Sequence, residues 1–302
     1  MSEAAADSRA SRRNRIAGVV ISASSVQIGA AFGATVFPVV GPFGVAAMRQ
    51  LVSAITLLAI TRPPLRRIGL RRLTPALLLG LVLVGMNTAL YASVERIGLG
   101  LAVTIEFLGP LAIALATGGE AHGRRGPRAL DAACAALALA GVVLLTGAVG
   151  GSRLDPLGLL LGVAAAVLWA AYILLNQRAG ALPGVTGTAV ASLTGTVLTL
   201  PFLLVILAGV PRAVLPHVLL IGAVTGLLSS ALPYSLDLVI LRTLPRSLFG
   251  MLQSLHPVAA AVFGLLVLGQ HLEPLQLAGI VAVCLANVLT VAMHGRGAGS
   301  AA

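Results

Sequence analysis

Two charged side chains interrupt stretches that are otherwise apolar. Glu106 lies inside AVTIEFLGPLAIAL, residues 102–115, with Pro110 one helical turn later, and Arg49 lies inside a second apolar run. A charge at the centre of a membrane helix costs about 2.5–3.5 kcal/mol on insertion scales, so it persists where a partner or a water-filled cavity receives it. Two interpretations follow: a structural ion pair between Arg49 and Glu106, or groups that meet a charged substrate or a coupling proton.

Further polar side chains recur at helical spacing along apolar runs, so each set shares one face of a helix. Any single one is explained by a hydrogen bond between helices. Several such faces together predict a hydrated central cavity for substrate binding or coupling. Besides Glu106 and Arg49, its predicted residues are Gln27, Asn87, Tyr91, Trp169, Tyr172, Ser230, Tyr234, Asp237, Gln253 and His256.

The elements that must position these residues are membrane helices. The 302-residue chain is 58% hydrophobic and 10% charged, and its mean hydropathy is +1.02. A membrane-spanning helix needs about 20 mostly apolar residues, and the chain lacks the alternating strands of a membrane barrel. The predicted class is all-α and polytopic, with ten transmembrane helices at 16–38, 42–60, 73–93, 98–117, 129–148, 157–176, 186–209, 213–236, 247–268 and 274–294.

The positive charge is distributed as a topology signal. Sixteen of the twenty basic residues, all arginines, fall in the N-terminal segment, in alternate loops and at the C-terminus, whereas the opposite loops hold three. The positive-inside rule then places both termini in the cytoplasm. Basic residues spread through short loops do not form one surface for nucleic acid. Residues 1–15 and 295–302 are predicted to be cytoplasmic tails, the first of them disordered.

Other function classes lack their residues. The chain has no lysine, so a P-loop ATPase site is excluded. Cys134 and Cys284 lie in apolar spans without metal-ligand spacing, and no metal or other cofactor is predicted. Ser254 and His256, two residues apart, face different sides of a helix, which argues against an intramembrane serine hydrolase. We therefore predict that the protein is not an enzyme.

The chain divides into two halves of five spans at the polar stretch GAVGGSRLDP, residues 147–156. An odd number of spans per half inverts the second half in the membrane. A shift of 147 residues superimposes EFLGP (106–110) on QSLHP (253–257), with Pro110 on Pro257. We predict two inverted repeats, 16–148 and 157–294, an arrangement suited to alternating access. Each proline removes a backbone hydrogen bond beside a polar residue, either as a gate or as a packing kink.

Four long motifs resemble the EamA branch of the drug/metabolite transporter superfamily, and within it the inner-membrane threonine and homoserine exporters. They are residues 24–49, 85–115, 169–180 (WAAYILLNQRAG) and 229–277. The resemblance covers essentially the whole membrane region. It departs from the family pattern at Asp237, where a glutamate is usual, at His256, where an acidic residue is usual, and at Gln270, which replaces the glutamate of LGE.

The resemblance implies ten helices in inverted repeats and export of small amino acids or related metabolites across the bacterial cytoplasmic (inner) membrane. The energy would come from the proton gradient or the substrate's own gradient. The implied partners are a small-molecule substrate, protons and the lipid bilayer, and no nucleic acid. An alternative is efflux of more apolar drugs or metabolites, because aromatic residues at 91, 169, 172 and 234 would suit such a cavity.

Overall fold

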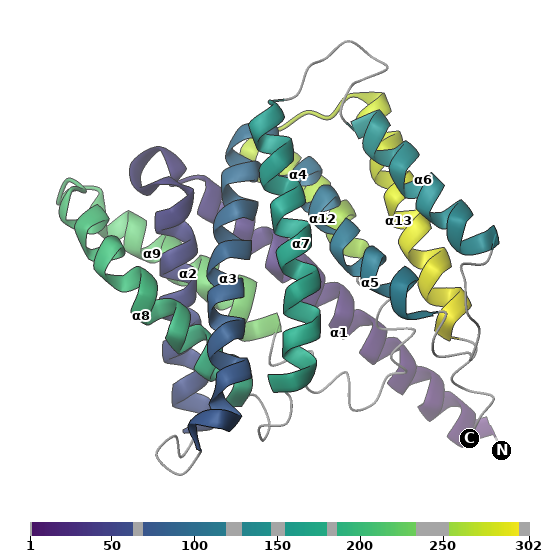
Figure 1. Ribbon diagram of the computed structural model, residues 1–302, viewed down its shortest axis with the longest axis horizontal. Helices are drawn as coiled ribbons and strands as arrows, with labels where there is room; N and C mark the ends of the chain where they lie inside the picture. The colour runs from purple at the N-terminus through teal and green to yellow at the C-terminus, as the bar shows by residue number, and fades with distance from the viewer. Residues whose placement is uncertain are drawn as a thin grey trace.

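The described part of the chain folds into helices. The computed structural model describes residues 2–62, 69–118, 129–145, 155–179, 186–233 and 254–295, and no strand occurs among them, which confirms the all-α class. Its elements are α1 (Ser2–Ala34), α2 (Phe37–Thr61), α3 (Leu70–Ile97), α4 (Leu99–Glu106), α5 (Leu108–Gly118), α6 (Ala129–Leu145), α7 (Pro156–Ala179), α8 (Thr186–Ala208), α9 (Leu215–Gly226), the π-helical segment η3 (Leu227–Ala231), α12 (Leu255–Leu268) and α13 (Pro274–Gly295) (Figure 1).

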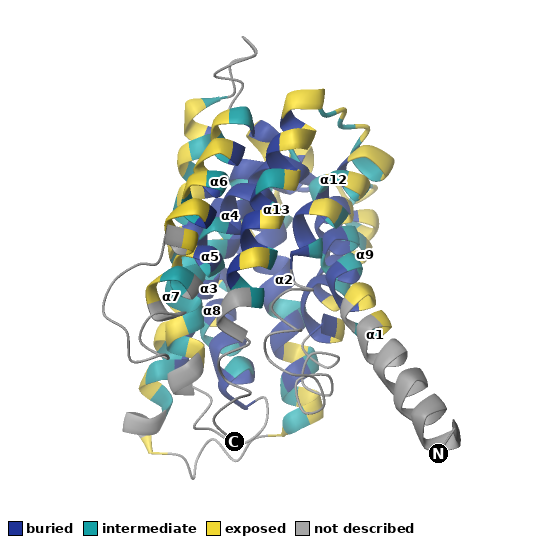
Figure 2. Ribbon diagram, turned by 90° about the vertical axis from the view of Figure 1, so that its right-hand side faces the viewer, coloured by how far each residue is buried: buried dark blue, intermediate teal, exposed yellow. Residues whose placement is uncertain are grey.

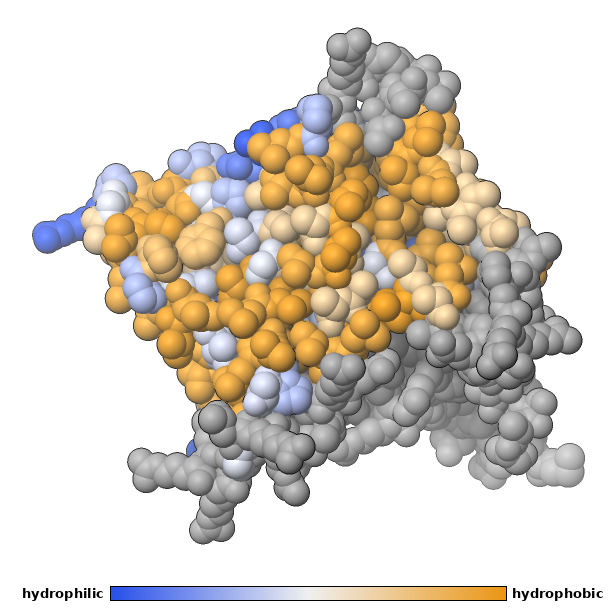
Figure 3. Space-filling model, in the orientation of Figure 1, coloured by the Kyte–Doolittle hydropathy of each residue, from blue (hydrophilic) through white to orange (hydrophobic). Residues whose placement is uncertain are grey.

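Several helices have the length and composition of membrane spans. Among the described residues, five are long and apolar enough to cross a bilayer, and each overlaps one predicted span: α2, α3, α7, α8 and α13. Shorter apolar helices overlap the other predicted spans, at Val20–Ala34, Leu99–Ile113, Ala132–Leu145, Leu215–Ala231 and Leu255–Leu268. Large apolar side chains such as Val205 and Leu266 point outward, 74% and 70% exposed, and apolar side chains dominate the visible surface (Figure 3). An exterior of this kind is suited to lipid.

The first helix begins earlier than the sequence predicts. Helix α1 starts at Ser2, so residues 2–15, which belong to the predicted disordered tail 1–15, have helical backbone. This segment is rich in alanine and arginine, and both residues have high helix propensity.

Proline splits one predicted span into two helices. The sequence predicts one helix over 98–117, but α4 ends at Glu106 and α5 begins at Leu108. Pro110 has no N–H to donate to the Glu106 carbonyl, and its ring crowds that carbonyl. Phe107, at the break, has φ −65° and ψ −11°. Ser254, which precedes α12 and lies three residues before Pro257, has nearly the same backbone angles, φ −64° and ψ −6°.

The helices of the two halves interleave. Helix α2 packs along α8, and α6 packs along α13. Helix α7 contacts α3 and α4, while α1 contacts η3, α9 and α12. Helix α4 in turn packs on α12, which closes a ring around the middle of the molecule. The inward faces of these helices are buried, whereas exposed residues gather on the outside (Figure 2).

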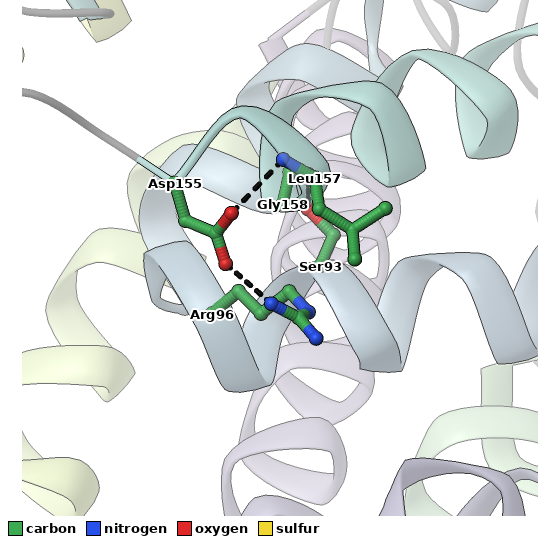
Figure 4. A network of polar contacts seen from close by, with 5 residues as sticks. All are labelled: Ser93, Arg96, Asp155, Leu157 and Gly158. Carbon is green, nitrogen blue, oxygen red and sulfur yellow. Dashed lines mark hydrogen bonds and ion pairs between the residues drawn. The ribbon is translucent and has the colours of Figure 1, made fainter.

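A polar contact joins α3 to the start of α7 (Figure 4). Asp155 Oδ1 accepts from the Leu157 backbone N–H at 2.9 Å, and Arg96 donates to Asp155 Oδ2 at 2.5 Å. The hydrogen bond from Arg96 holds the pKa of Asp155 below its usual range, with a further contribution from the Leu157 N–H. Below these groups, Ser93 donates to the Gly158 carbonyl at 2.8 Å. Because the side chains of the ion pair are partly exposed to solvent, the pair contributes little to stability.

Close backbone packing sets α5 against α7. A Cβ atom at Gly109 would lie 2.2 Å from the carbonyl oxygen of Ala166, so a side chain at this position forces the helices apart. Small residues at helix interfaces permit such approach in membranes. Gly109 therefore holds the segment after Glu106 against the helix that carries Trp169.

Gly109→Ala tests this contact. We expect a loss of about 1–3 kcal/mol, typical of overpacking in a filled interface, seen as a lower Tm of the purified protein. Gly69→Ala is the control, because a Cβ there meets no atom within 4 Å. Equal Tm values for Gly109→Ala and wild type would contradict the packing of α5 on α7.

Candidate functional site

A cavity of about 160 Å³ lies between helices of both halves. Elements from the first half of the chain, α1 to α4, line it together with α7, the η3 region and α12 of the second half. Its lining residues are Ser22, Val26, Gln27, Ala30, Arg49, Met86, Asn87, Leu90, Glu106, Phe107, Trp169, Tyr172, Ser229, Pro233 and His256.

The structure brings most of the predicted site residues to this cavity. Seven of them line it: Gln27, Arg49, Asn87, Glu106, Trp169, Tyr172 and His256. Tyr91 and Ser230 lie directly behind, in contact with Arg49. Tyr234, Asp237 and Gln253 lie outside the described residues. Their contribution to the site remains a prediction.

Arg49 links α2 to the second half of the chain. Its Nε donates to Ser230 Oγ at 3.0 Å, and its NH2 donates to the Ser229 carbonyl at 2.8 Å. Pro233 cannot donate to the Ser229 carbonyl as a helix would require, so the guanidinium supplies that hydrogen bond. A third donation, at 3.4 Å, reaches the hydroxyl of Tyr91 on α3. The residue as a whole is buried, with Arg49 8% exposed.

Glu106 does not form the direct ion pair that one interpretation of the sequence requires. Among the described residues, the only side chains that approach within an N–O distance of 4.0 Å as an ion pair are Arg96 and Asp155. Arg49 instead directs N–H groups to η3 and to Tyr91. The Glu106 side chain is 5% exposed, and no described residue donates a hydrogen bond to its carboxylate. It ends α4 at the break and lines the cavity.

Phe107 is a cavity residue that the sequence analysis missed. Its ring meets Trp169 edge-on with centroids 4.6 Å apart, and it lies 5.5 Å from the His256 ring. An edge-to-face pair of this kind favours a fixed geometry. The signal available in the sequence was its place three residues before Pro110, next to Glu106.

Two amides on the cavity wall are only partly hydrogen-bonded. Gln27 Nε2 lies 3.1 Å from His256 Nδ1; with the amide as donor, the imidazole accepts there and carries its proton on Nε2. Asn87 Nδ2 donates to the Leu83 carbonyl at 2.8 Å. The oxygens Gln27 Oε1 and Asn87 Oδ1 are buried and have no hydrogen-bond partner among the described residues.

Two polar residues near predicted site residues in the chain do not line the cavity, Ser24 on α1 and Asn176 on α7. Ser24 is absent from the cavity wall, which takes Ser22 instead, and Asn176 is exposed. In the described ranges, no three His, Cys, Asp or Glu side chains come together in a metal-binding arrangement. The chemistry available at this site is therefore that of hydrogen bonds, charge and aromatic surface.

Replacing Arg49 by methionine tests the link between the halves. Arg49→Met leaves the Ser229 carbonyl and Ser230 hydroxyl without their donor, and each buried unsatisfied group costs about 1–3 kcal/mol. We expect a clearly lower Tm. Arg96→Met is the control, since that arginine is exposed and its pair contributes little. Equal losses in the two variants would contradict a linking role for Arg49.

Comparison with known proteins identifies the family. The EamA-like transporter family model matches residues 156–292. A "Threonine/homoserine exporter RhtA" of Salmonella typhimurium (strain LT2) is 37% identical over 281 residues, 90% of each chain. The protein of the same name in Escherichia coli (strain K12) is 36% identical over 286 residues, 92% of each chain.

A solved structure shares the fold. A chain described as "Crystal structure of protein" superimposes with a TM-score of 0.58 at 20% identity, over 92% of this chain and 98% of that chain. At 20% sequence identity, this similarity shows a shared fold and nothing about function. The sequence relatives, which cover nine-tenths of the chain, establish the family that the motifs predicted: this chain belongs to the EamA-like transporter family.

Proposed function

We propose that the protein exports small amino acids, threonine and homoserine among them, from the cytoplasm by secondary active transport. The observation that carries the proposal is the cavity between the two halves, which is lined by a carboxyl group, a guanidinium and two amides. A zwitterion has both charges to match such groups. The names of the relatives that cover nine-tenths of the chain support this substrate class.

Alternating access is the mechanism we propose for this site. It needs two inverted five-helix repeats, 16–148 and 157–294, with ten helices in all. The contacts support this: α1 packs on α12 as α7 packs on α4, and α1 packs on α9 as α7 packs on α3. These contacts are related by exchange of the halves. The matching backbone angles at Phe107 and Ser254, which a shift of 147 residues aligns, support the same relation.

The same proposal places the protein as a multi-pass component of the bacterial cytoplasmic membrane, with both termini in the cytoplasm. The basis is the bias of arginines to one set of loops. In this orientation the α3–α4 turn and the α12–α13 connection lie on the outer side. There Gln270 Oε1 accepts from the Leu99 backbone N–H at 2.9 Å, joining α4 to the end of α12. This bond would hold the outer side closed.

The cavity size fits a small solute. Its volume of about 160 Å³ is close to the ~150 Å³ of an engineered cavity that binds benzene. Glu106 would bind the substrate's ammonium group or a coupling proton. Arg49 would attract the substrate's carboxylate. Proton coupling or exchange driven by the substrate gradient would supply the energy. No cofactor and no catalytic step enter this scheme.

Efflux of more apolar molecules is the second candidate. The observation in its favour is the aromatic wall of Phe107 and Trp169, with ring centroids 4.6 Å apart. Flat apolar solutes would stack there. Uptake of labelled threonine and of a lipophilic cation into the same vesicles separates the two candidates.

Glu106→Gln, assayed in proteoliposomes under an imposed pH gradient, tests the proposed function. The change keeps the size of the side chain and removes its charge, so we expect at least about a tenfold loss of threonine flux with normal membrane insertion, as for loss of a hydrogen bond to a charged group. Glu95→Gln, the same change at an exposed residue, is the control and should retain flux.

Two results would count against the proposal. Wild-type protein that moves no threonine or homoserine would remove the substrate class. Full flux in Glu106→Gln would remove Glu106 from the transport cycle.

A further inference from the structure

The cavity wall carries buried hydrogen-bond acceptors that have no donor among the described residues. Two buried amide oxygens on this wall, Gln27 Oε1 and Asn87 Oδ1, accept from no described residue. The Glu106 carboxyl group lines the same cavity. Gln27 and Asn87 are 3% and 2% exposed. A buried acceptor without a donor costs about 1–3 kcal/mol, so such atoms call for a partner that arrives from outside the described chain.

Arg49, Gln27 and Asn87 each donate at least one hydrogen bond to a protein group. Arg49 donates to the Ser229 carbonyl, to Ser230 and to Tyr91. The amide nitrogens of Gln27 and Asn87 face His256 Nδ1 and the Leu83 carbonyl. The two amides thus donate to protein groups, whereas their oxygens accept from no described residue.

The other unpaired polar atoms differ from these in kind and place. They are the Thr88, Thr225 and Ser254 hydroxyls and the Gln50 amide nitrogen. None of these residues lines the cavity. The two unpaired amide oxygens therefore coincide with the cavity wall.

The backbone adds to the same polarity. Helix α4 ends at Glu106, and Pro110 cannot donate to the carbonyl of that residue. The C-terminal end of a helix carries partial negative charge and favours a cation. A primary ammonium carries one positive charge and three N–H donors, which matches two amide oxygens and one carboxyl group on the wall of the same cavity.

We infer that Gln27, Asn87 and Glu106 together form the subsite for the substrate's protonated amine, and that this subsite leads recognition. Small primary amines and amino alcohols without a carboxylate therefore enter the same cavity. The carboxylate contributes less, because Arg49 must first release protein partners to reach it. This inference rests on the proposed export of small amino acids and names the part of the substrate that the site reads.

Three probes separate the two ends of the substrate. Threonine has both charges, threoninol keeps the amine and lacks the carboxylate, and N-acetylthreonine keeps the carboxylate and lacks the amine. Binding to the purified full-length protein in lipid nanodiscs is measured by calorimetry. We expect threonine and threoninol to bind within about tenfold of each other, and N-acetylthreonine to bind at least about tenfold more weakly than either.

Variants then assign the preference to the named atoms. Gln27→Met and Asn87→Leu remove the acceptors at similar volume, and each should weaken threoninol about 10- to 100-fold, so that its advantage over N-acetylthreonine shrinks. Asn87→Asp keeps an acceptor oxygen and should retain the amine preference. This rescue distinguishes a contact with the amine from a general loss of structure.

Matched controls exist in the same protein. Gln50→Met alters a buried amide away from the cavity. Asn287→Leu alters a buried asparagine that, like Asn87, donates to the carbonyl four residues earlier, at 3.1 Å. Both should leave the affinities unchanged.

The outcomes distinguish this inference from the proposed function. If wild type binds and transports no threonine, the proposed function fails. If it transports threonine but N-acetylthreonine binds as well as threoninol, the inference alone is overturned. Equal weakening of all three probes in Gln27→Met and Asn87→Leu would also overturn it, because the amides would then be structural or satisfied by water.

Discussion

A buried guanidinium that must be hydrogen-bonded organises the centre of this protein. Arg49 lies on α2 in the first half of the chain, and its partners on η3 belong to the second. The Ser229 carbonyl is available because Pro233, four residues later, has no N–H to offer. Neither group is tolerable alone in an apolar interior. Their mutual satisfaction fixes α2 against η3 and brings Tyr91 of α3 to the same point.

The cavity follows from this arrangement. With Arg49 held by η3, the carboxylate of Glu106 lacks the direct pair that would neutralise it, and it lines the cavity instead. The break at Phe107, caused by Pro110, ends α4 there and places an aromatic ring beside Trp169. Close packing of Gly109 on Ala166 holds the next helix in place. Charge, aromatic surface and unpaired amides thus meet in one small volume.

Much of this could be predicted from residue types. Apolar runs indicated the positions of the helices, because twenty apolar residues have few alternatives to a membrane helix. Polar residues such as Gln27, Asn87 and Trp169 share a cavity because polar faces turn away from lipid. The family follows from motifs spread along the chain, and the relatives confirm it.

Other features depend on three-dimensional detail that spacing does not contain. From the sequence, Arg49 and Glu106 are candidates for an ion pair because their charges are opposite. In the structure, Arg49 donates instead to the Ser229 carbonyl, to which Pro233 cannot donate. Helix α1 starts at Ser2 because alanine and arginine have high helix propensity. From the sequence we predict a disordered tail there, because the segment is rich in charged residues. The count of ten membrane helices, the inverted repeat and the roles of Tyr234, Asp237 and Gln253 rest on sequence arguments and the proposal built on them.

The central claim is that the two halves enclose a polar space that a solute reaches from water. Ser22→Cys, in a chain whose Cys134 and Cys284 are replaced by serine, places a thiol on the cavity wall. Ser192→Cys, buried away from the cavity, is the reference. We predict that a small charged thiol reagent labels the first in cells or in inverted vesicles, more slowly with threonine present, and leaves the second unlabelled. Absence of labelling at position 22 from both sides of the membrane would contradict the account.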